Sequence, residues 1–103
     1  MNLDQNSGEV ITLSEAQNLV RDFQTVHPQE IKAFYVGSNL LKAIMEQEGC
    51  IGLRIYNAYD DQSKTKTVVL VGVDEDENDM KEGVIVDKTF RCPPTCPTVS
   101  ILD

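Results

Sequence analysis

The fold of this chain is decided by residues 51–73, which read IGLRIYNAYDDQSKTKTVVLVGV. Apolar residues alternate with other residues from Ile51 to Tyr56, and this period of two predicts a strand with one apolar face. Residues 67–73 are apolar at nearly every position, which is typical of a central strand that is covered on both faces. The polar residues 60–65 between the two segments predict a turn, so we expect the strands to pair antiparallel.

Two helices are predicted before this strand pair. Residues 12–15 have the pattern of a capping box, and apolar residues then recur at helical spacing as far as Val26. A second helix is predicted at residues 39–48, with Ser38 as its N-cap and with a glycine, Gly49, as its C-terminal cap.

The segments around these elements complete the predicted fold. Residues 31–36 form a short apolar patch that predicts either a helical turn or a short strand. An acidic turn at residues 74–83 leads to a third strand at 84–88. We therefore predict an α+β fold in which two N-terminal helices pack on a three-stranded antiparallel meander, with residues 91–103 as an extended tail.

This architecture is predicted to form a single domain over residues 1–103, with residues 1–11 flexible because they are polar. The helices can cover only one face of the sheet. The second apolar face therefore needs another cover, either the apolar tail or a second copy of the chain. We favour a homodimer to which the tail contributes.

The charge of the chain limits its partners. It has 17 acidic and nine basic residues, for a net charge of −8. Such a surface repels polyanions, so we expect no nucleic-acid partner and no binding to an anionic membrane. The first ten residues have neither the basic start nor the apolar run of a signal peptide. With three cysteines and no export signal, we expect a cytoplasmic protein whose thiols are free.

Residues 92–97 read CPPTCP and contain two of the three cysteines. A proline after each cysteine favours an extended chain, in which the two sulfur atoms lie about 12 Å apart. Only a turn at Pro94 or a cis proline would bring Cys92 and Cys96 within disulfide range. Two interpretations stay open: a redox pair activated by the adjacent Arg91, or two incidental thiols in a proline-braced tail.

We predict no metal site. In a meander, Cys50 opens the first strand, and Cys92 follows the third strand at the opposite end of the sheet, too far away to share a zinc ion. Cys50 is therefore expected to be a small buried hydrophobic residue. The acidic residues 74–79 resemble a calcium loop, but Asp79 and Ile85 replace the required glycine and glutamate. A solvated acidic turn is the preferred interpretation.

Arg54 is the residue that most suggests ligand binding. It shares a strand face with Tyr56, and Tyr35 could approach from the preceding segment. An arginine among tyrosines can hold a carboxylate or a phosphate group. The alternatives are an ion pair between Arg54 and an acid on a neighbouring strand, or an arginine on an open face. His27 is the only histidine, so a multi-histidine metal site is not available within one chain, and we predict no catalytic residues.

Four motifs follow one another along the chain: EGCIGLRIY at 48–56, VLVGVD at 69–74, NDM at 78–80 and CPPTC at 92–96. This order resembles that of a group of short bacterial proteins that carry such a strand pair and end in a Cys-Pro-Pro-x-Cys tail. The resemblance covers about the last two-thirds of the chain. It implies a bacterial origin but no activity and no functional residue.

These observations predict a small acidic binding module that is not an enzyme, needs no cofactor, and works through self-association or a protein partner. Its candidate binding residues are Arg54, Tyr56 and Tyr35. The alternative is a thiol-based redox or metal-binding function at Cys92 and Cys96. A second alternative is an acidic inhibitor or immunity-type protein that masks a basic partner.

Overall fold

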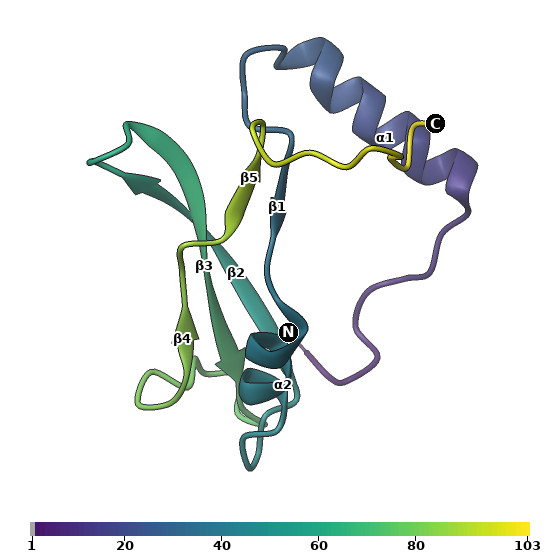
Figure 1. The fold of residues 1–103 in the computed structure, drawn as a ribbon. Helices are drawn as coiled ribbons and strands as arrows, with labels where there is room; N and C mark the ends of the chain where they lie inside the picture. Colours follow the sequence, from purple (N-terminus) through teal and green to yellow (C-terminus); the bar gives the residue numbers. More distant parts are fainter. Residues whose placement is uncertain (1) are drawn as a thin grey trace.

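A long β-hairpin forms the centre of the computed structural model, which describes residues 2–103 (Figure 1). Strands β2 (Gly52–Asp60) and β3 (Thr65–Val73) pair antiparallel, with Arg54 opposite Val71. The short strand β4 (Ile85–Val86) pairs with the other edge of β3, so the strand order is β2-β3-β4. The predicted α+β fold with a three-stranded antiparallel sheet is therefore confirmed.

The strands differ in length from the predicted ones. Pairing continues beyond Tyr56 to Asp60, because ladder hydrogen bonds join backbone groups whether or not the side chains are apolar. The third strand is shorter than the predicted 84–88 and ends after Val86. Lys88 has a positive φ of 54°, which lies outside the β region.

Helix α2 (Ser38–Met45) covers one face of this sheet. Its Ile44 is fully buried and packs on the strands beneath it, at Leu70 and Val86. The helix therefore packs its apolar face on the strand pair, as predicted.

Both ends of α2 differ from the prediction. The N-cap is Gly37 and not Ser38, and it makes no side-chain hydrogen bond to the helix. The helix ends at Met45 rather than Glu48. Gly49 has the predicted left-handed backbone, with φ of 83°, but in the turn that follows the helix and not at its cap.

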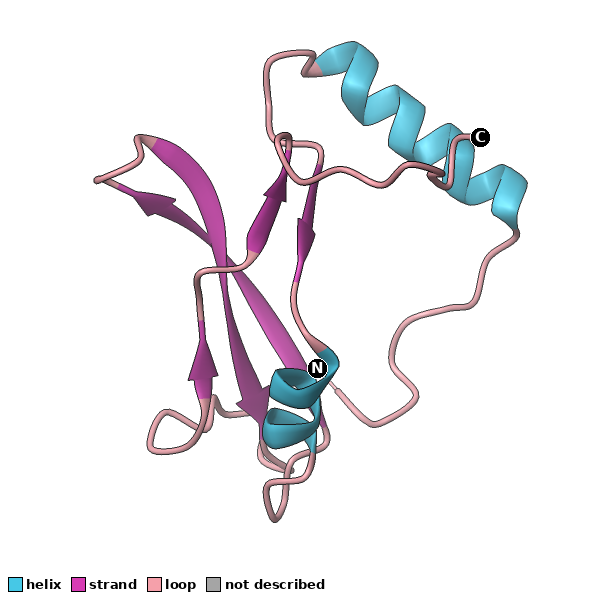
Figure 2. Ribbon diagram, in the orientation of Figure 1, coloured by secondary structure: helices cyan, strands magenta, loops and turns pink. Residues whose placement is uncertain are grey.

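A second, two-stranded sheet lies beside the hairpin (Figure 2). Strand β1 (Ala33–Tyr35) pairs antiparallel with β5 (Phe90–Cys92), so Tyr35 lies opposite Phe90 and Ala33 opposite Cys92. The ambiguous patch at residues 31–36 is thus a strand. The expected extended tail begins in this β5 strand and then turns back on itself, as described below.

Helix α1 (Leu13–Val26) stands apart from both sheets and lies along the C-terminal tail (Figure 1). Its N-cap is as predicted, since the N–H of Glu15 donates to Oγ1 of Thr12 at 3.1 Å. None of its residues is buried, and Nε2 of Gln17 donates to the carbonyl oxygen of Ile101 in the tail at 3.0 Å. The prediction that two helices pack on the sheet therefore holds for α2 only.

Replacing Ile44 by alanine is expected to lower the free energy of unfolding by about 2–5 kcal/mol, because a cavity would open between α2 and the sheet. Leu40→Ala, one turn earlier in the same helix where the side chain is 47% exposed, is the matched control and should cost about 1 kcal/mol or less. Urea unfolding followed by circular dichroism measures both. Equal losses in the two variants would contradict the packing of α2 on the sheet.

Candidate functional site

Two of the three predicted binding residues meet around an acid from the loop between β3 and β4. Arg54 and Tyr56 point to the same side of β2 because they are two residues apart on a strand. Oδ1 of Asp79 accepts a hydrogen bond from Nη1 of Arg54 at 2.5 Å, and its Oδ2 accepts one from the hydroxyl of Tyr56. We call these three residues the Arg54 cluster.

The Arg54 cluster lies across the central strand. Val73 of β3 pairs with Gly52 of β2 on one side and forms a β-bridge with Asp79 on the other side. The side chains of Arg54 and Asp79 therefore meet over β3. Val71 and Val73 point to this same face, and each is only 4% exposed.

The cluster corrects two expectations. The second face of β3 was expected to be covered by the tail or by a second copy, but at Val71 the chain covers it with its own ion pair. The acidic turn was expected to be solvated, and Asp79 is an exception, with a side chain that is only 28% exposed. An arginine that faces an apolar strand needs a counter-ion, and this was the signal that pointed to a nearby acid.

Tyr35 does not belong to the cluster. It lies on β1 in the two-stranded sheet, opposite Phe90, whereas Arg54 lies on β2 in the larger sheet. Tyr35 and Phe90 are each 62% exposed. The predicted set of three binding residues is therefore divided between two parts of the molecule, and a role for any of them in partner binding stays a prediction.

The loop that carries Asp79 is shaped by hydrogen bonds within it. Oδ1 of Asp74 accepts from the backbone N–H groups of Asp76 and Asn78, at 2.9 and 3.0 Å. Glu77 has a positive φ of 68°, which turns the chain back toward the sheet. Asp74 thus stabilises the turn that places Asp79 beside Arg54.

The hydrogen bonds of the Arg54 cluster favour one protonation state of Asp79 and one of Tyr56. The hydrogen bond from Tyr56, aided by the Arg54 guanidinium, lowers the pKa of the Asp79 carboxyl below its ordinary value. The same hydrogen bond to the carboxylate raises the pKa of the Tyr56 hydroxyl, and partial burial adds to this rise. At neutral pH the cluster therefore holds a cation, a carboxylate and a neutral phenol, an arrangement suited to fixing structure rather than transferring protons.

Cys92 and Cys96 form a disulfide, with their Cα atoms 4.8 Å apart. The expected extended geometry, with sulfur atoms about 12 Å apart, is therefore wrong. The chain turns within this segment: the N–H of Thr95 donates to the carbonyl of Arg91 at 2.8 Å, and the Cys92-Pro93 and Pro93-Pro94 peptide bonds are cis. The expectation of free thiols holds for Cys50 only, which is partly buried and packs against the core.

Arg91 does not face the disulfide. It alternates with Cys92 along β5, and its Nη1 donates to Oγ1 of Thr65 at 2.5 Å and to Oγ of Ser63 at 3.2 Å. It therefore ties β5 to the turn of the hairpin. Lys32 lines the same cleft as Cys92 and Cys96. The positively charged side chain beside the two cysteines is therefore Lys32 and not Arg91.

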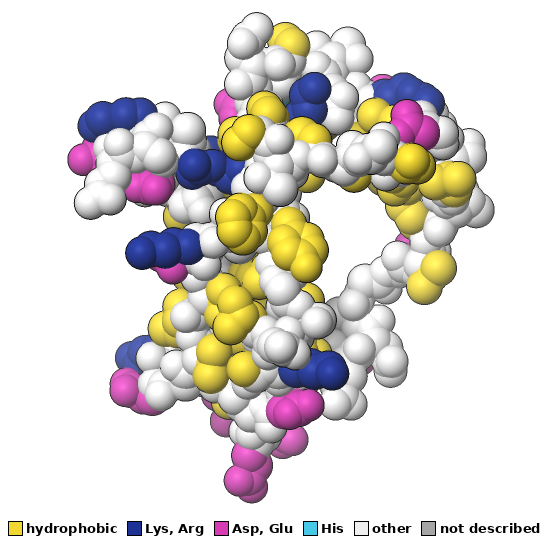
Figure 3. All heavy atoms as spheres, viewed as in Figure 1, with side chains coloured by type: hydrophobic (Ala, Val, Ile, Leu, Met, Phe, Trp, Pro, Cys, Tyr) yellow, Lys and Arg dark blue, Asp and Glu magenta, His cyan; other side chains and the backbone are white. Residues whose placement is uncertain are grey.

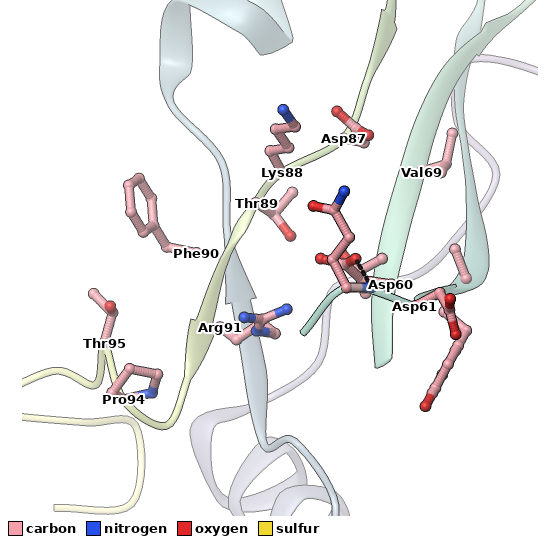
Figure 4. Close-up of a pocket in the computed structure, with 14 residues that line it drawn as sticks. Asp60, Asp61, Val69, Asp87, Lys88, Thr89, Phe90, Arg91, Pro94 and Thr95 are labelled. Atoms are coloured by element: carbon pink, nitrogen blue, oxygen red, sulfur yellow. Dashed lines mark hydrogen bonds between the residues drawn. The ribbon is translucent and has the colours of Figure 1, made fainter. Parts of the chain in front are cut away.

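A cleft of about 650 Å³ lies over the Val69 end of the same sheet face, between the hairpin turn and residues 87–95 (Figure 4). Its walls carry acids and bases together, so neither sign of charge dominates. The charged residues are Asp60, Asp61, Asp87, Lys88 and Arg91. Within residues 2–103, no three histidine, cysteine or acidic side chains are grouped closely enough to hold a metal ion.

No helix in the described part of the chain has the length and apolar character needed to cross a membrane. The fold and the sites define a small α+β protein with a structural ion-pair cluster and a disulfide turn. Comparisons with protein-family models, curated proteins and solved structures find no match to this chain. Its function is therefore argued from its own residues.

Asp79→Asn is expected to destabilise the protein at neutral pH, because Arg54 would lose its counter-ion. The pKa of Asp79 is lower in the folded state, so its contribution is present above about pH 4 and is lost as the pH falls through the folded-state pKa. The stability difference from the wild type should therefore shrink below about pH 4. Urea unfolding at several pH values measures it. Asp76→Asn in the same loop is the control, and an identical pH profile for both variants would contradict this role.

One thiol per chain, that of Cys50, is expected to react with Ellman's reagent in denatured, unreduced protein, and three after reduction. Cys50→Ser provides the control, with no reactive thiol before reduction. Three reactive thiols in the unreduced wild type would show that the Cys92–Cys96 bond does not form.

Proposed function

We propose that this chain is a non-enzymatic interaction module that presents an apolar surface to a protein partner. The proposal rests on the solvent-exposed area of the chain, which is larger than that of a compact monomer of the same mass. The chain exposes 7938 Å², whereas a compact monomer of 11.5 kDa exposes about 5,800 Å². Its radius of gyration is 15.3 Å, against about 12.8 Å expected for a compact chain of 103 residues.

Exposed apolar side chains on α1 and on the β1–β5 ribbon contribute to this surface. Leu19 and Val26 of α1 are 64% and 69% exposed, although they belong to the apolar stripe of an amphipathic helix. In the space-filling view, apolar side chains gather along the ribbon and along α1, on two sides of an opening through the molecule (Figure 3). Clusters of exposed apolar side chains of this kind are typical of protein-binding sites.

The polar sites support a binding role over a catalytic one. In the Arg54 cluster, the Arg54 guanidinium and the Tyr56 hydroxyl already donate hydrogen bonds to the carboxylate of Asp79. His27 packs beside Phe23, with ring centroids 5.1 Å apart, at the end of α1. These polar side chains therefore already have partners within the chain.

A thiol–disulfide function is the second candidate, and the Cys92–Cys96 bond favours it. Cys96 is exposed whereas Cys92 is buried. An external thiolate would attack Sγ of Cys96, form a mixed disulfide and release Cys92 as a thiolate. The rate at which glutathione opens the bond tests this candidate, and a rate no faster than that of an ordinary exposed disulfide would contradict it.

The acidic-inhibitor hypothesis stays a prediction. Residues 74–82 contain six acids and one base, which suits a basic partner. One of these acids, Asp79, already pairs with Arg54 within the chain. The apolar surface lies on other elements.

The interaction module is tested by small-angle scattering on the monomeric form, obtained by dilution and identified by its scattering mass. We expect a radius of gyration near 15.3 Å, because α1 contacts the tail but stands apart from both sheets. The monomer should also bind an apolar dye. A dye-free monomer with a radius near the compact value of about 12.8 Å would contradict the proposal.

A further inference from the structure

We infer that the partner of the proposed interaction module is a second copy of this chain, an inference that rests on the proposed function. Two surfaces meet in this dimer. The outer flank of α1 consists of Leu19, Phe23 and Val26, and the ribbon face consists of Tyr35 and Phe90. The outer flank of each copy packs on the ribbon face of the other, so that a twofold axis forms the contact twice.

The outer flank is the part of the apolar stripe that the chain itself leaves uncovered. Leu19, Phe23 and Val26 are spaced i, i+4 and i+7, and therefore lie along one side of the helix. All three side chains are exposed to solvent. Val20 and Gln24 point elsewhere and line a cleft formed with the tail. The tail thus positions α1 while leaving its outer flank available.

The ribbon face offers a matching apolar surface. Tyr35 and Phe90 are cross-strand neighbours in β1 and β5, and they point to the same side of the ribbon. Ala33 and Cys92, the next pair on that side, line the cleft beside α1. Two adjacent aromatic rings provide a rigid surface on which leucine and phenylalanine side chains pack well. Aromatic residues are also enriched at the centres of protein interfaces.

The distribution of charge permits self-association through these elements despite the net charge of −8. Helix α1 carries two acids and one base, and residues 27–36 and 87–103 together carry three acids and three bases. The acid-rich residues 74–82 lie at the opposite end of the sheet from α1 (Figure 1). Pairing α1 with the ribbon of a second copy therefore joins two nearly neutral surfaces and keeps the acidic loops out of the contact.

The total exposed area of the chain leaves room for a dimer interface. Each chain exposes about 2,100 Å² more than a compact monomer of its mass. A standard protein interface buries about 800 Å² on each partner, and larger areas are typical of permanent homodimers. Reciprocal burial of the outer flank and the ribbon face would cover part of this excess on both chains.

Light scattering at micromolar concentration tests the inference. We expect the wild type to be a dimer, and we expect Phe23→Glu and Phe90→Glu each to raise the dissociation constant at least about tenfold. Tyr59→Glu is the matched control, because Tyr59 is as exposed as Phe90 but lies on the hairpin. Its dissociation constant should not change. Circular dichroism establishes that each variant is folded.

Mixing the two variants distinguishes the proposed contact from a contact between two α1 helices. Phe23→Glu chains keep an intact ribbon face, and Phe90→Glu chains keep an intact outer flank. An equimolar mixture should therefore recover dimers that contain one undamaged contact. The proposed interface would be overturned if Phe23→Glu weakened the dimer and Phe90→Glu did not. It would also be overturned if neither substitution weakened the dimer.

The outcome for the wild type separates this inference from the proposed function. A monomer with a radius of gyration near 15.3 Å would overturn self-association and leave the interaction module in place. A compact monomer of about 12.8 Å would overturn both. A dimer that dissociates in both single variants and re-forms in the mixture supports both.

Discussion

Strand β3 is apolar on both faces, and the rest of the structure depends on how those two faces are covered. On one face, Ile44 of α2 packs over Leu70. On the other face, the side chain of Arg54 crosses from β2 to meet Asp79 above Val71. The long stem of an arginine can shield apolar surface while its charged end finds a partner, so an ion pair is able to cover a strand that a helix does not reach.

The hairpin and its covering helix could be predicted from the sequence because side-chain periodicity is a local property of the chain. The alternation after Ile51 and the apolar run at 67–73 are sufficient to place two antiparallel strands. The partner of Arg54 is not a local property. Six acids follow β3, and only the backbone bridge between Asp79 and Val73 places one of them within reach. The candidate arginine was therefore predictable, whereas its counter-ion was not.

The errors at α1 and at the cysteines have the same origin. The amphipathic stripe of α1 predicts that the helix buries one side, but it does not indicate which surface provides the cover. Likewise, a proline after each cysteine predicts an extended chain, but the pairing of β5 with β1 and the hydrogen bond from Thr95 to Arg91 impose a turn. In both cases the local preference was read correctly, but contacts that the residue pattern does not specify decided the outcome.

The disulfide turn and the apolar surface belong to one structural unit. Cys92 is part of β5, which carries Phe90, and Cys96 begins the segment whose Ile101 is hydrogen-bonded to α1. Opening the bond would remove the cross-link between β5 and the start of the tail that lies beside α1. If reduction of the disulfide changes self-association of the chain, the altered packing of the tail is sufficient to explain that change. Redox chemistry at the cysteines has to be judged by the rate of thiol exchange, because loss of binding is expected on either interpretation.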